Sequence, residues 1–269
     1  MYTASLAKNI QTTAVTIDKV TYSYDASNKA AVEDISFTID KGEFTVLIGP
    51  NGAGKSTILK IINGLLKPHK GSVRVLGEDP ASSIHVKRRI AYIPQRGEVD
   101  WDYPVTVLDV VLMGRYPYLR GLKRYRREDL EAGLKALETV GMLEYADRRI
   151  RDLSGGQQQR VFLARMLAQD PEIYLLDEPL TGLDVVTEDI VIEVLEGERR
   201  KGKTVIMSTH HLSNYFKQLD KLVLLNQRLI AWGPASTVLT EELLLKTYGG
   251  SPTALHVADI KGMLVERES

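Results

Sequence analysis

The residues with the clearest chemical meaning form a glycine-rich run that ends in a lysine and a serine. The run is Gly49, Pro50, Asn51, Gly52, Ala53, Gly54, Lys55 and Ser56, a complete G-x-x-x-x-G-K-[ST] motif. Glycines let backbone N–H groups converge on phosphate oxygens, and the N-terminus of a following helix adds a positive dipole. Lys55 would then reach the β- and γ-phosphates of a nucleotide, Ser56 would bind Mg²⁺, and Thr57 could donate to the α-phosphate. The alternative, a glycine turn with a chance lysine, is disfavoured by the apolar run before it and the helical pattern after it.

A second candidate site lies where an apolar strand ends in two carboxylates. The strand is Ile173–Asp177, and Glu178 and Pro179 follow it. Asp177, at the strand tip, could hold Mg²⁺ through its water shell. Glu178 lies one residue further, so it points elsewhere and could polarise an attacking water as a general base. An acidic cap on the next helix is the alternative, and the pairing with the phosphate loop favours the catalytic interpretation.

The third pattern is a short polar loop before a stretch rich in helix formers. After Leu153 the loop consists of Ser154, Gly155, Gly156 and Gln157. Ser154 followed three residues later by Gln157 predicts a capping box at a helix N-terminus. The two glycines add what a cap does not need, backbone amides that are free to approach an anion. The chain's own phosphate loop already cradles one nucleotide, so this loop would serve another.

Together these three patterns resemble the ATP-binding cassette (ABC) family, whose signature is LSGGQ. The resemblance covers roughly residues 15–250. It implies an α/β fold of the P-loop NTPase type, with a mostly parallel core sheet, an N-terminal antiparallel β subdomain and an inserted helical signature subdomain. It also implies ATP and Mg²⁺ as cofactors. Its functional particle is a head-to-tail pair, in which each signature loop binds the γ-phosphate held by a second copy.

Three further residues match motifs of this family. The resemblance implies that Gln95 contacts Mg²⁺ and water, that Asp184 lies at the seam between the two copies, and that His210 hydrogen-bonds the γ-phosphate. A histidine that follows a strand is more often structural, and this alternative stays open for His210. The family commonly has Asp after this histidine, whereas the chain has His211, to which we assign no catalytic role.

The adenine position has two candidates. The family places an aromatic residue there that stacks on adenine, and Tyr24 occupies the matching position. Tyr22 is a close competitor two residues earlier, and a tyrosine at either position could simply lie on the face of a strand.

The elements that must position these residues follow from hydrophobic periodicity. Alternating apolar and polar residues predict half-buried strands at Val15–Tyr24 and Ile35–Ile39, joined by a turn-like stretch at 25–29. Apolar runs predict further strands at Phe44–Ile48, Ile90–Ile93, Ile173–Asp177, Thr204–Ser208 and Leu222–Leu225. Helical patterns are expected at 55–66, 157–169 and 187–200. This alternation implies a parallel sheet with helices on its faces.

The middle of the chain has a different pattern. From Val107 to Gly141 it is helical, and no strand pattern interrupts it, which predicts a helical insertion at roughly 96–165. We therefore expect an N-terminal extension at 1–14, an ATPase domain at 15–250 that contains this insertion, and a C-terminal tail at 251–269.

The composition narrows the class of protein. The 269 residues include 35 basic and 35 acidic side chains and no cysteine. Absence of cysteine excludes disulfides, thiolate metal sites and catalytic thiols. Zero net charge argues against a nucleic-acid partner. We expect neither a membrane span nor a secretory signal, because no apolar run approaches the roughly 20 residues that cross a bilayer.

Two segments bear on what the ATPase would drive. Residues 97–116 and 225–234 resemble those of the ATP-binding subunits of manganese, zinc and iron uptake systems. The resemblance implies an importer with transmembrane permease subunits as partners and a solute-binding protein as an indirect one. It also implies a cytoplasmic location, peripheral on the inner face of the plasma membrane. The five histidines are scattered, so we expect cargo selection to lie in another subunit.

Other functions share the same catalytic motifs. One alternative is an importer ATPase whose cargo is a siderophore or haem. The other is a soluble ABC ATPase of iron–sulfur cluster assembly. A DNA-maintenance cassette is disfavoured by the neutral charge and by the spacing of the motifs, because Ser154 lies 99 residues after Lys55, which leaves no room for a long coiled coil. Only the surface that meets a partner separates the remaining hypotheses.

A run of positive charge lies between residues 110 and 127. Its members are Arg115, Arg120, Lys123, Arg124, Arg126 and Arg127, with no acidic residue among them before 127. A solvated loop beside a helix is the simplest interpretation. The competing hypothesis is a surface near anionic lipid headgroups or acidic partner loops, where each charge could contribute about 1 kcal/mol.

Overall fold

The computed structural model describes residues 12–24, 30–95, 97, 103–119, 124–210 and 219–249. His211, the turn-like stretch at 25–29, the tail at 251–269 and most of the N-terminal extension lie outside the described residues. Within the described part, no helix has both the length and the apolar character needed to span a bilayer.

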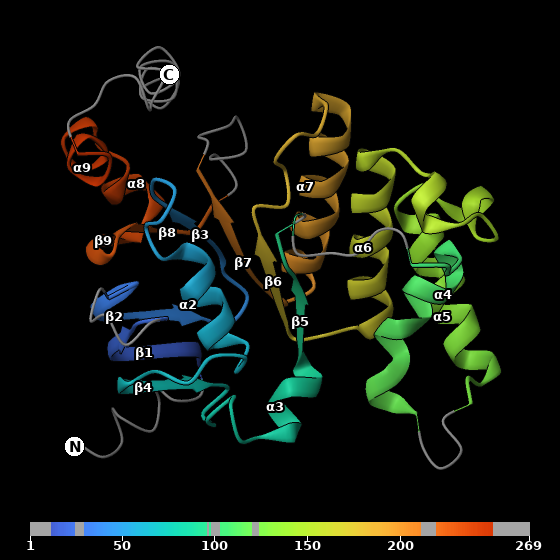
Figure 1. Ribbon diagram of the computed structural model, residues 1–269, viewed down its shortest axis with the longest axis horizontal. Helices are drawn as coiled ribbons and strands as arrows, with labels where there is room; N and C mark the ends of the chain where they lie inside the picture. The colour runs from blue at the N-terminus through green and yellow to red at the C-terminus, as the bar shows by residue number, and fades with distance from the viewer. Residues whose placement is uncertain are drawn as a thin grey trace.

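The core is a six-stranded sheet with the order β5-β6-β7-β3-β8-β9 (Figure 1). The strands are β3 (Phe44–Ile48), β5 (Ile90–Ile93), β6 (Ile173–Asp177), β7 (Thr204–Thr209), β8 (Lys221–Asn226) and β9 (Arg228–Pro234). The first five are parallel, and only β9 pairs antiparallel, with β8. The expectation of a mostly parallel core sheet is confirmed. A parallel sheet collects the carboxyl ends of its strands along one edge, which faces the top of Figure 1.

A second, antiparallel sheet has the order β2-β1-β4. It consists of β1 (Thr13–Tyr22), β2 (Val32–Asp40) and β4 (Lys70–Val75). The predicted antiparallel subdomain is therefore present. Its first strand ends at Tyr22, two residues earlier than the periodicity predicted, so Tyr24 lies beyond the strand. The sequence did not predict β4, because only Val73 and Val75 of its six residues are buried.

Helix α2 (Lys55–Ile62) lies between the two sheets. Its apolar side chains, among them Ile58, Leu59 and Ile62, pack in one buried cluster with residues of β1, β2 and β4 and with one face of the core sheet. The short helix α3 (Ile84–Arg89) precedes β5. Because α2 begins at Lys55 and is fixed by this cluster, its N-terminus is held at the carboxyl edge of the core sheet.

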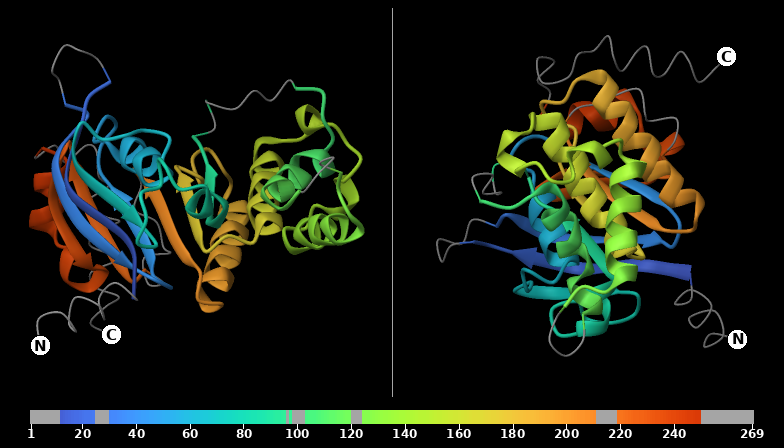
Figure 2. Two further views of the ribbon diagram at one scale, coloured as in Figure 1. Left: turned by 90° about the horizontal axis from the view of Figure 1, so that it is seen from below. Right: turned by 90° about the vertical axis from the view of Figure 1, so that its right-hand side faces the viewer.

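The other face of the core sheet is covered by α6 (Gly155–Gln169) and α7 (Val185–Arg200), which share a second buried cluster. Helices α4 (Val107–Leu112) and α5 (Arg127–Thr139) pack on α6 and gather at one end of the molecule (Figure 2). Short 3₁₀ turns occur at Met113–Tyr118, Leu143–Tyr145 and Ile150–Asp152. After β9 come α8 (Ala235–Val238) and α9 (Glu241–Thr247), neither of which the sequence predicted.

The helical pattern predicted from 107 to 141 is correct in type but does not form one helix. α4 ends at Leu112, and a 3₁₀ turn containing Pro117 follows. A β-carbon on Gly114 would lie 2.2 Å from the carbonyl oxygen of Arg165, so this turn is pressed against α6. The chain therefore changes direction where Pro117 removes a backbone donor and Gly114 permits close packing.

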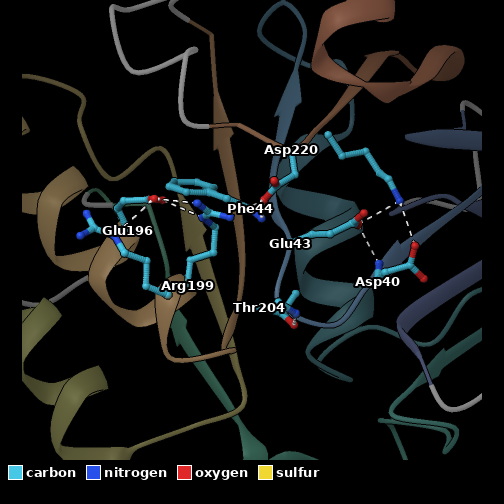
Figure 3. A network of polar contacts seen from close by, with 10 residues as sticks. Asp40, Glu43, Phe44, Glu196, Arg199, Thr204 and Asp220 are labelled. Carbon is cyan, nitrogen blue, oxygen red and sulfur yellow. Dashed lines mark hydrogen bonds and ion pairs between the residues drawn. The ribbon is translucent and has the colours of Figure 1, made fainter.

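The amino ends of the core strands are joined by a polar network (Figure 3). Lys221, the first residue of β8, lies 2.9 Å from Glu43 Oε2, and the same oxygen accepts a hydrogen bond from the backbone N–H of Asp40. Asp220 accepts from the backbone N–H of Phe44 at 2.8 Å. The contacts of Lys221 and Asp220 tie the start of β8 to the turn between β2 and β3, and the bond from Asp40 braces that turn.

Helix α7 ends in the same network. Arg199 donates two hydrogen bonds to Glu196, at 2.8 and 2.7 Å, and a third to Asp220 at 3.4 Å. The bonds to Glu196 raise the pKa of Arg199 and lower the pKa of Glu196. The network fixes the amino edge of the sheet and so supports the strands that carry the site at the other edge.

Candidate nucleotide-binding site

The glycine-rich run forms the loop between β3 and α2. Gly52 and Gly54 have φ angles of 78° and 94°, a region that side chains with a β-carbon rarely adopt. A β-carbon on Gly54 would lie 2.3 Å from Val32 Cγ1 and 2.7 Å from the carbonyl oxygen of Ala31. Glycine at 54 is thus required by both the backbone angle and the contact with β2. Gly54 caps α2, so the free N–H groups of the helix face the loop.

Lys55 is turned back onto this loop. Its Nζ donates to the carbonyl oxygens of Gly49 at 2.8 Å and Pro50 at 3.1 Å. It also lies 3.5 Å from Glu178 Oε1. Burial lowers the pKa of Lys55, and the neighbouring Glu178 opposes that shift. The loop thus holds a poorly hydrated cation, which is an arrangement suited to a phosphate group.

Asp177 ends β6 and is buried at this edge. Its Oδ1 accepts a hydrogen bond of 2.6 Å from the Ser208 hydroxyl. Burial raises the pKa of Asp177, against hydrogen bonds from Ser208 and Ser56 that lower it. Asp177 Oδ2 is buried and lacks a well-formed hydrogen bond within the described part of the chain. An unsatisfied carboxylate oxygen near a serine hydroxyl fits a hard divalent cation such as Mg²⁺.

Glu178 faces Lys55 and His210 rather than Asp177. Its backbone has a φ of 49°, which is uncommon for a residue other than glycine. Its N–H donates to Ser208 Oγ at 2.9 Å, so one serine hydroxyl contacts both acidic residues. Its Oε2 lies 3.1 Å from His210 Nδ1, and Thr181 donates to the same oxygen at 3.5 Å. The turn separates the two carboxylates as the sequence predicted. Ser208, which links them, was not predicted.

His210 follows the last residue of β7. Thr209 pairs with Ile48, the residue before the phosphate loop, and Ser208 pairs with Asp177. This register brings His210 beside the glycine-rich loop and the acidic pair. The hydroxyl of Tyr248 donates to the backbone oxygen of His210 at 3.1 Å, which fixes the chain there.

Gln95 emerges at the same edge. β5 pairs with β6 so that Ile93 lies opposite Leu176, and Gln95 comes two residues later. Its side chain is exposed. The structure therefore brings Gln95 to the edge that holds Asp177, while the predicted contact with Mg²⁺ stays a prediction.

Tyr24, rather than Tyr22, reaches the phosphate-loop helix. The Tyr24 hydroxyl lies 3.2 Å from Thr57 Oγ1, and 57% of the residue is exposed. Tyr22 lies at the end of β1, half-buried and packed against the core cluster between the sheets. Of the two candidates, Tyr24 is the more exposed and the one in contact with the phosphate-loop helix.

The predicted capping box at Ser154 is confirmed. Its side chain accepts from the N–H of Gln157 at 3.4 Å, and its own N–H donates to Gln157 Oε1 at 2.9 Å. A β-carbon on Gly156 would lie 3.1 Å from Thr187 Oγ1, and Thr187 in turn donates from its N–H and its hydroxyl to Asp184. These bonds lower the pKa of Asp184. The signature loop and Asp184 thus begin two adjoining helices.

The signature loop belongs to a different face of the sheet from the phosphate loop. The buried residues of α2 pack in the cluster between the sheets, whereas those of α6 pack in the cluster on the opposite face. Both helices begin toward the top of Figure 1. Each loop therefore presents its backbone N–H groups at a separate place.

The positive run at 110–127 is partly internal. Arg115 is half-buried, lies 2.9 Å from Asp129 Oδ1 and donates to the carbonyl oxygen of Ala168. Arg127 is exposed but pairs with Glu131 at 2.7 Å. Arg120 and Lys123 lie outside the described residues. The suggestion that all six charges form one surface is therefore wrong for Arg115, since helix packing gives it an acidic partner that lies beyond the run.

The sequence that forms this edge matches a known family. The ABC transporter family corresponds to residues 32–181, more than half of the chain. The chain belongs to the ABC transporter family. The cassette contains both the phosphate loop and the acidic strand within that match, as expected for its ATP-binding domain, and its ATPase character follows from that domain.

Relatives of this ABC cassette carry informative names. The manganese transport system ATP-binding protein MntB of Bacillus subtilis (strain 168) is 47% identical over 241 residues, which cover 90% of this chain and 94% of that protein. The zinc transport system ATP-binding protein TroB of Treponema pallidum (strain Nichols) is 44% identical over 237 residues, or 88% of this chain and 87% of that one.

Solved structures agree with the fold of the cassette. A metal-chelate type ABC transporter in an inward-facing conformation superposes with a TM-score of 0.76 at 29% identity, covering 87% of this chain and 88% of that one. The dimeric structure of the bacterial cassette MJ0796 gives a TM-score of 0.72 at 29% identity, covering 82% and 98%.

Proposed function

We propose that this chain is the ATP-hydrolysing subunit of an importer for a divalent metal, with manganese, zinc and iron as the candidate cargoes. The observation that carries the ATPase part is the cluster of Lys55, Asp177, Glu178 and His210 around the glycine-rich loop. The names of the manganese and zinc relatives, which align over nearly the whole chain, support the cargo class.

ATP phosphates would bind at the N-terminus of α2 and draw Lys55 away from the carbonyl oxygens of Gly49 and Pro50. The N–H groups of the loop from Gly49 to Thr57 would contact the phosphates. Ser56 and Asp177 would hold Mg²⁺, with Gln95 beside them. Bound Mg²⁺ would neutralise charge on the β- and γ-phosphates. Tyr24 would receive the adenine ring.

Glu178 would act as the general base. It would accept a proton from water as the water oxygen bonds to the γ-phosphorus and the bond from that phosphorus to the β-phosphate oxygen breaks. His210, which lies 3.1 Å from Glu178, would instead form a hydrogen bond with the γ-phosphate. ADP and phosphate would be released. The contacts of Glu178 with Lys55 and His210 would thus be exchanged for contacts with water and the phosphates before hydrolysis.

A second copy of the chain would complete each site. Ser154, Gly155, Gly156 and Gln157 begin a helix that lies on the opposite face of the sheet from the phosphate-loop helix. In a head-to-tail pair these N–H groups would bind the γ-phosphate held by the partner copy, with Asp184 at the seam. Donors from both copies would stabilise the transferring phosphoryl group, an electrostatic effect worth several kcal/mol.

The membrane part of the system would be separate. We assign transmembrane permease subunits as direct partners and a solute-binding protein as an indirect partner. The chain would be cytoplasmic and peripheral on the inner face of the plasma membrane, held by the permease. Its ATPase domain would span 15–250 with the helical subdomain at about 96–165, between the extension at 1–14 and the tail at 251–269.

A chelated metal is the second candidate cargo. The relative named chelated iron transport system membrane protein YfeB, from Yersinia pestis, is 44% identical over 247 residues. A metal-chelate type transporter is also among the similar solved structures. These two observations favour a chelate over haem as the alternative.

The test is ATPase activity of the reconstituted membrane complex, scanned against binding proteins loaded with Mn²⁺, Zn²⁺, Fe²⁺ or a ferric chelate. We expect stimulation by one free divalent ion and little by the chelate. Stimulation by the chelate alone would favour the second candidate. Purification of the chain with a soluble scaffold protein and no polytopic membrane subunit would contradict both.

A further inference from the structure

Three aromatic rings adjoin one another beside the phosphate loop. The ring centroids of Tyr24 and Tyr22 are 5.1 Å apart with their planes at 87°, an edge-to-face pair. Tyr22 and His69 are 4.9 Å apart with their planes at 30°, a stacked pair. We call His69, Tyr22 and Tyr24 the aromatic ladder. Both geometries are the favoured ones for rings that carry a quadrupole.

Tyr22, the middle ring of the ladder, packs against the protein core. Tyr22 pairs with Val32 in the antiparallel sheet and packs against the buried cluster between the two sheets. His69 is tied to the same strand, because its N–H donates to the backbone oxygen of Thr21 at 2.9 Å. Backbone bonds thus hold the main chain of Tyr22 and His69 in place, and the residue His69 is exposed.

Tyr24, at one end of the ladder, contacts the helix that follows the phosphate loop. The hydroxyl of Tyr24 lies 3.2 Å from Thr57 Oγ1 on the first turn of α2. The strand that pairs with Tyr22 also touches the loop, because Val32 and Ala31 leave no room for a side chain on Gly54. The ladder and the phosphate-binding N–H groups therefore form one connected unit.

We propose that His69 and Tyr22 are positioning residues that hold Tyr24 as the platform for the purine base. The inference rests on the proposed function, since it assumes that ATP phosphates occupy the loop. A tyrosine with 57% exposure loses side-chain freedom when it stacks on a base. The ring of Tyr22, already packed against it and itself stacked on His69, removes part of that cost before the nucleotide arrives. His69 touches no nucleotide and acts only through Tyr22.

The ladder can be tested with two ligands that differ only in the base and sugar. Binding of Mg·ATP and Mg·tripolyphosphate to the purified full-length chain is measured by calorimetry. His69→Ala is expected to weaken ATP binding about 3- to 10-fold, the range for one aromatic contact, and to leave tripolyphosphate binding unchanged. His69→Phe keeps a ring and is expected to restore ATP affinity. His85→Ala, an exposed histidine on α3, is the matched control.

The outcomes separate the ladder from the proposed function. An ATP-to-tripolyphosphate ratio that His69→Ala leaves unchanged would overturn the ladder, as would equal weakening of both ligands or failure of His69→Phe to restore the ratio. Tyr22→Phe keeps both ring contacts and should match the wild type; a changed ratio there would also count against the ring geometry. Failure of the wild-type chain to bind ATP at all would overturn the proposed function itself.

Discussion

Charged side chains lie in different environments at the amino and carboxyl edges of the core sheet. At the amino edge, Lys221 lies 2.9 Å from Glu43, and Arg199 donates two hydrogen bonds to Glu196. At the carboxyl edge, burial lowers the pKa of Lys55 and raises the pKa of Asp177. Hydrogen bonding thus favours the charged forms of Arg199 and Glu196, whereas burial disfavours those of Lys55 and Asp177.

This difference distinguishes charges that stabilise the fold from charges that serve ligand binding. Charges matched inside the chain hold strands together without a ligand. Charges that are buried and incompletely matched cost stability in the ligand-free protein, and a bound nucleotide and cation can offset that cost. Glu178, at the carboxyl edge, also has a positive φ, a conformation that costs free energy for a residue other than glycine.

The largest effect that distinguishes the two edges is expected for Glu178→Gln. The amide cannot accept a proton from water, so ATP hydrolysis should slow by at least about 10²-fold while ATP binding is retained. The variant should accumulate as a dimer, measured by size-exclusion chromatography with ATP. Glu242→Gln, exposed on α9, is the control. Near-normal turnover would remove Glu178 from the role of base.

The second-largest effect is expected for Lys55→Ala. Loss of a charge-assisted contact with the phosphates should weaken ATP binding by at least about tenfold and abolish productive binding. Titration of the purified chain with ATP measures this effect, with Lys246→Ala, an exposed lysine on α9, as the control. Tight binding by Lys55→Ala would argue against the phosphate-loop assignment.

A pair of isosteric changes compares the edges directly. Glu196→Gln should destabilise the ligand-free chain by about 1–2 kcal/mol, because the neutral amide can accept only one of the two hydrogen bonds from Arg199. Asp177→Asn should cost less, about 0–1 kcal/mol, because the carboxylate it replaces is desolvated and incompletely bonded. Chemical denaturation measures both. A larger loss for Asp177→Asn would remove the contrast between the edges.

The smallest effect is a pH dependence at the amino edge. Hydrogen bonds from Arg199 hold the pKa of Glu196 below its ordinary value of 4.5. The stability from this pair is therefore fully present above that value and is lost as the pH falls through the lower, folded-state pKa. The difference in unfolding free energy between the wild type and Glu196→Gln should be constant from about pH 8 to 5 and shrink below. Glu193→Gln, exposed on the same helix, should show no such trend.

The local parts of the site were predictable because their chemistry lies within one short segment. The glycine-rich loop, the acidic strand end and the Ser154 capping box each follow from residue type and spacing. The five parallel strands were also predicted, since buried strands are continuous apolar runs. β4 and β9 were missed because neither is a continuous buried run: β4 is largely exposed, and β9 is mostly half-buried or exposed.

Contacts between distant segments could not be read from spacing. Nothing in the sequence links Ser208 to Asp177, 31 residues away, and only strand pairing brings them together. The helical spacing at 127–139 was correct, yet Leu130 is exposed and Asp129 is buried. Asp129 is inside because Arg115 from another turn meets it, a partner that periodicity does not reveal.

The bridging hydroxyl of Ser208 has an evolutionary consequence. It bonds Asp177 at 2.6 Å and the backbone of Glu178 at 2.9 Å, so one oxygen serves the residue proposed for the cation and the residue proposed for water. A substitution that removes the hydroxyl at 208 would be felt at both residues at once. The side chains at 177 and 208 are bonded to each other directly, so we expect these two positions to change together if they change at all.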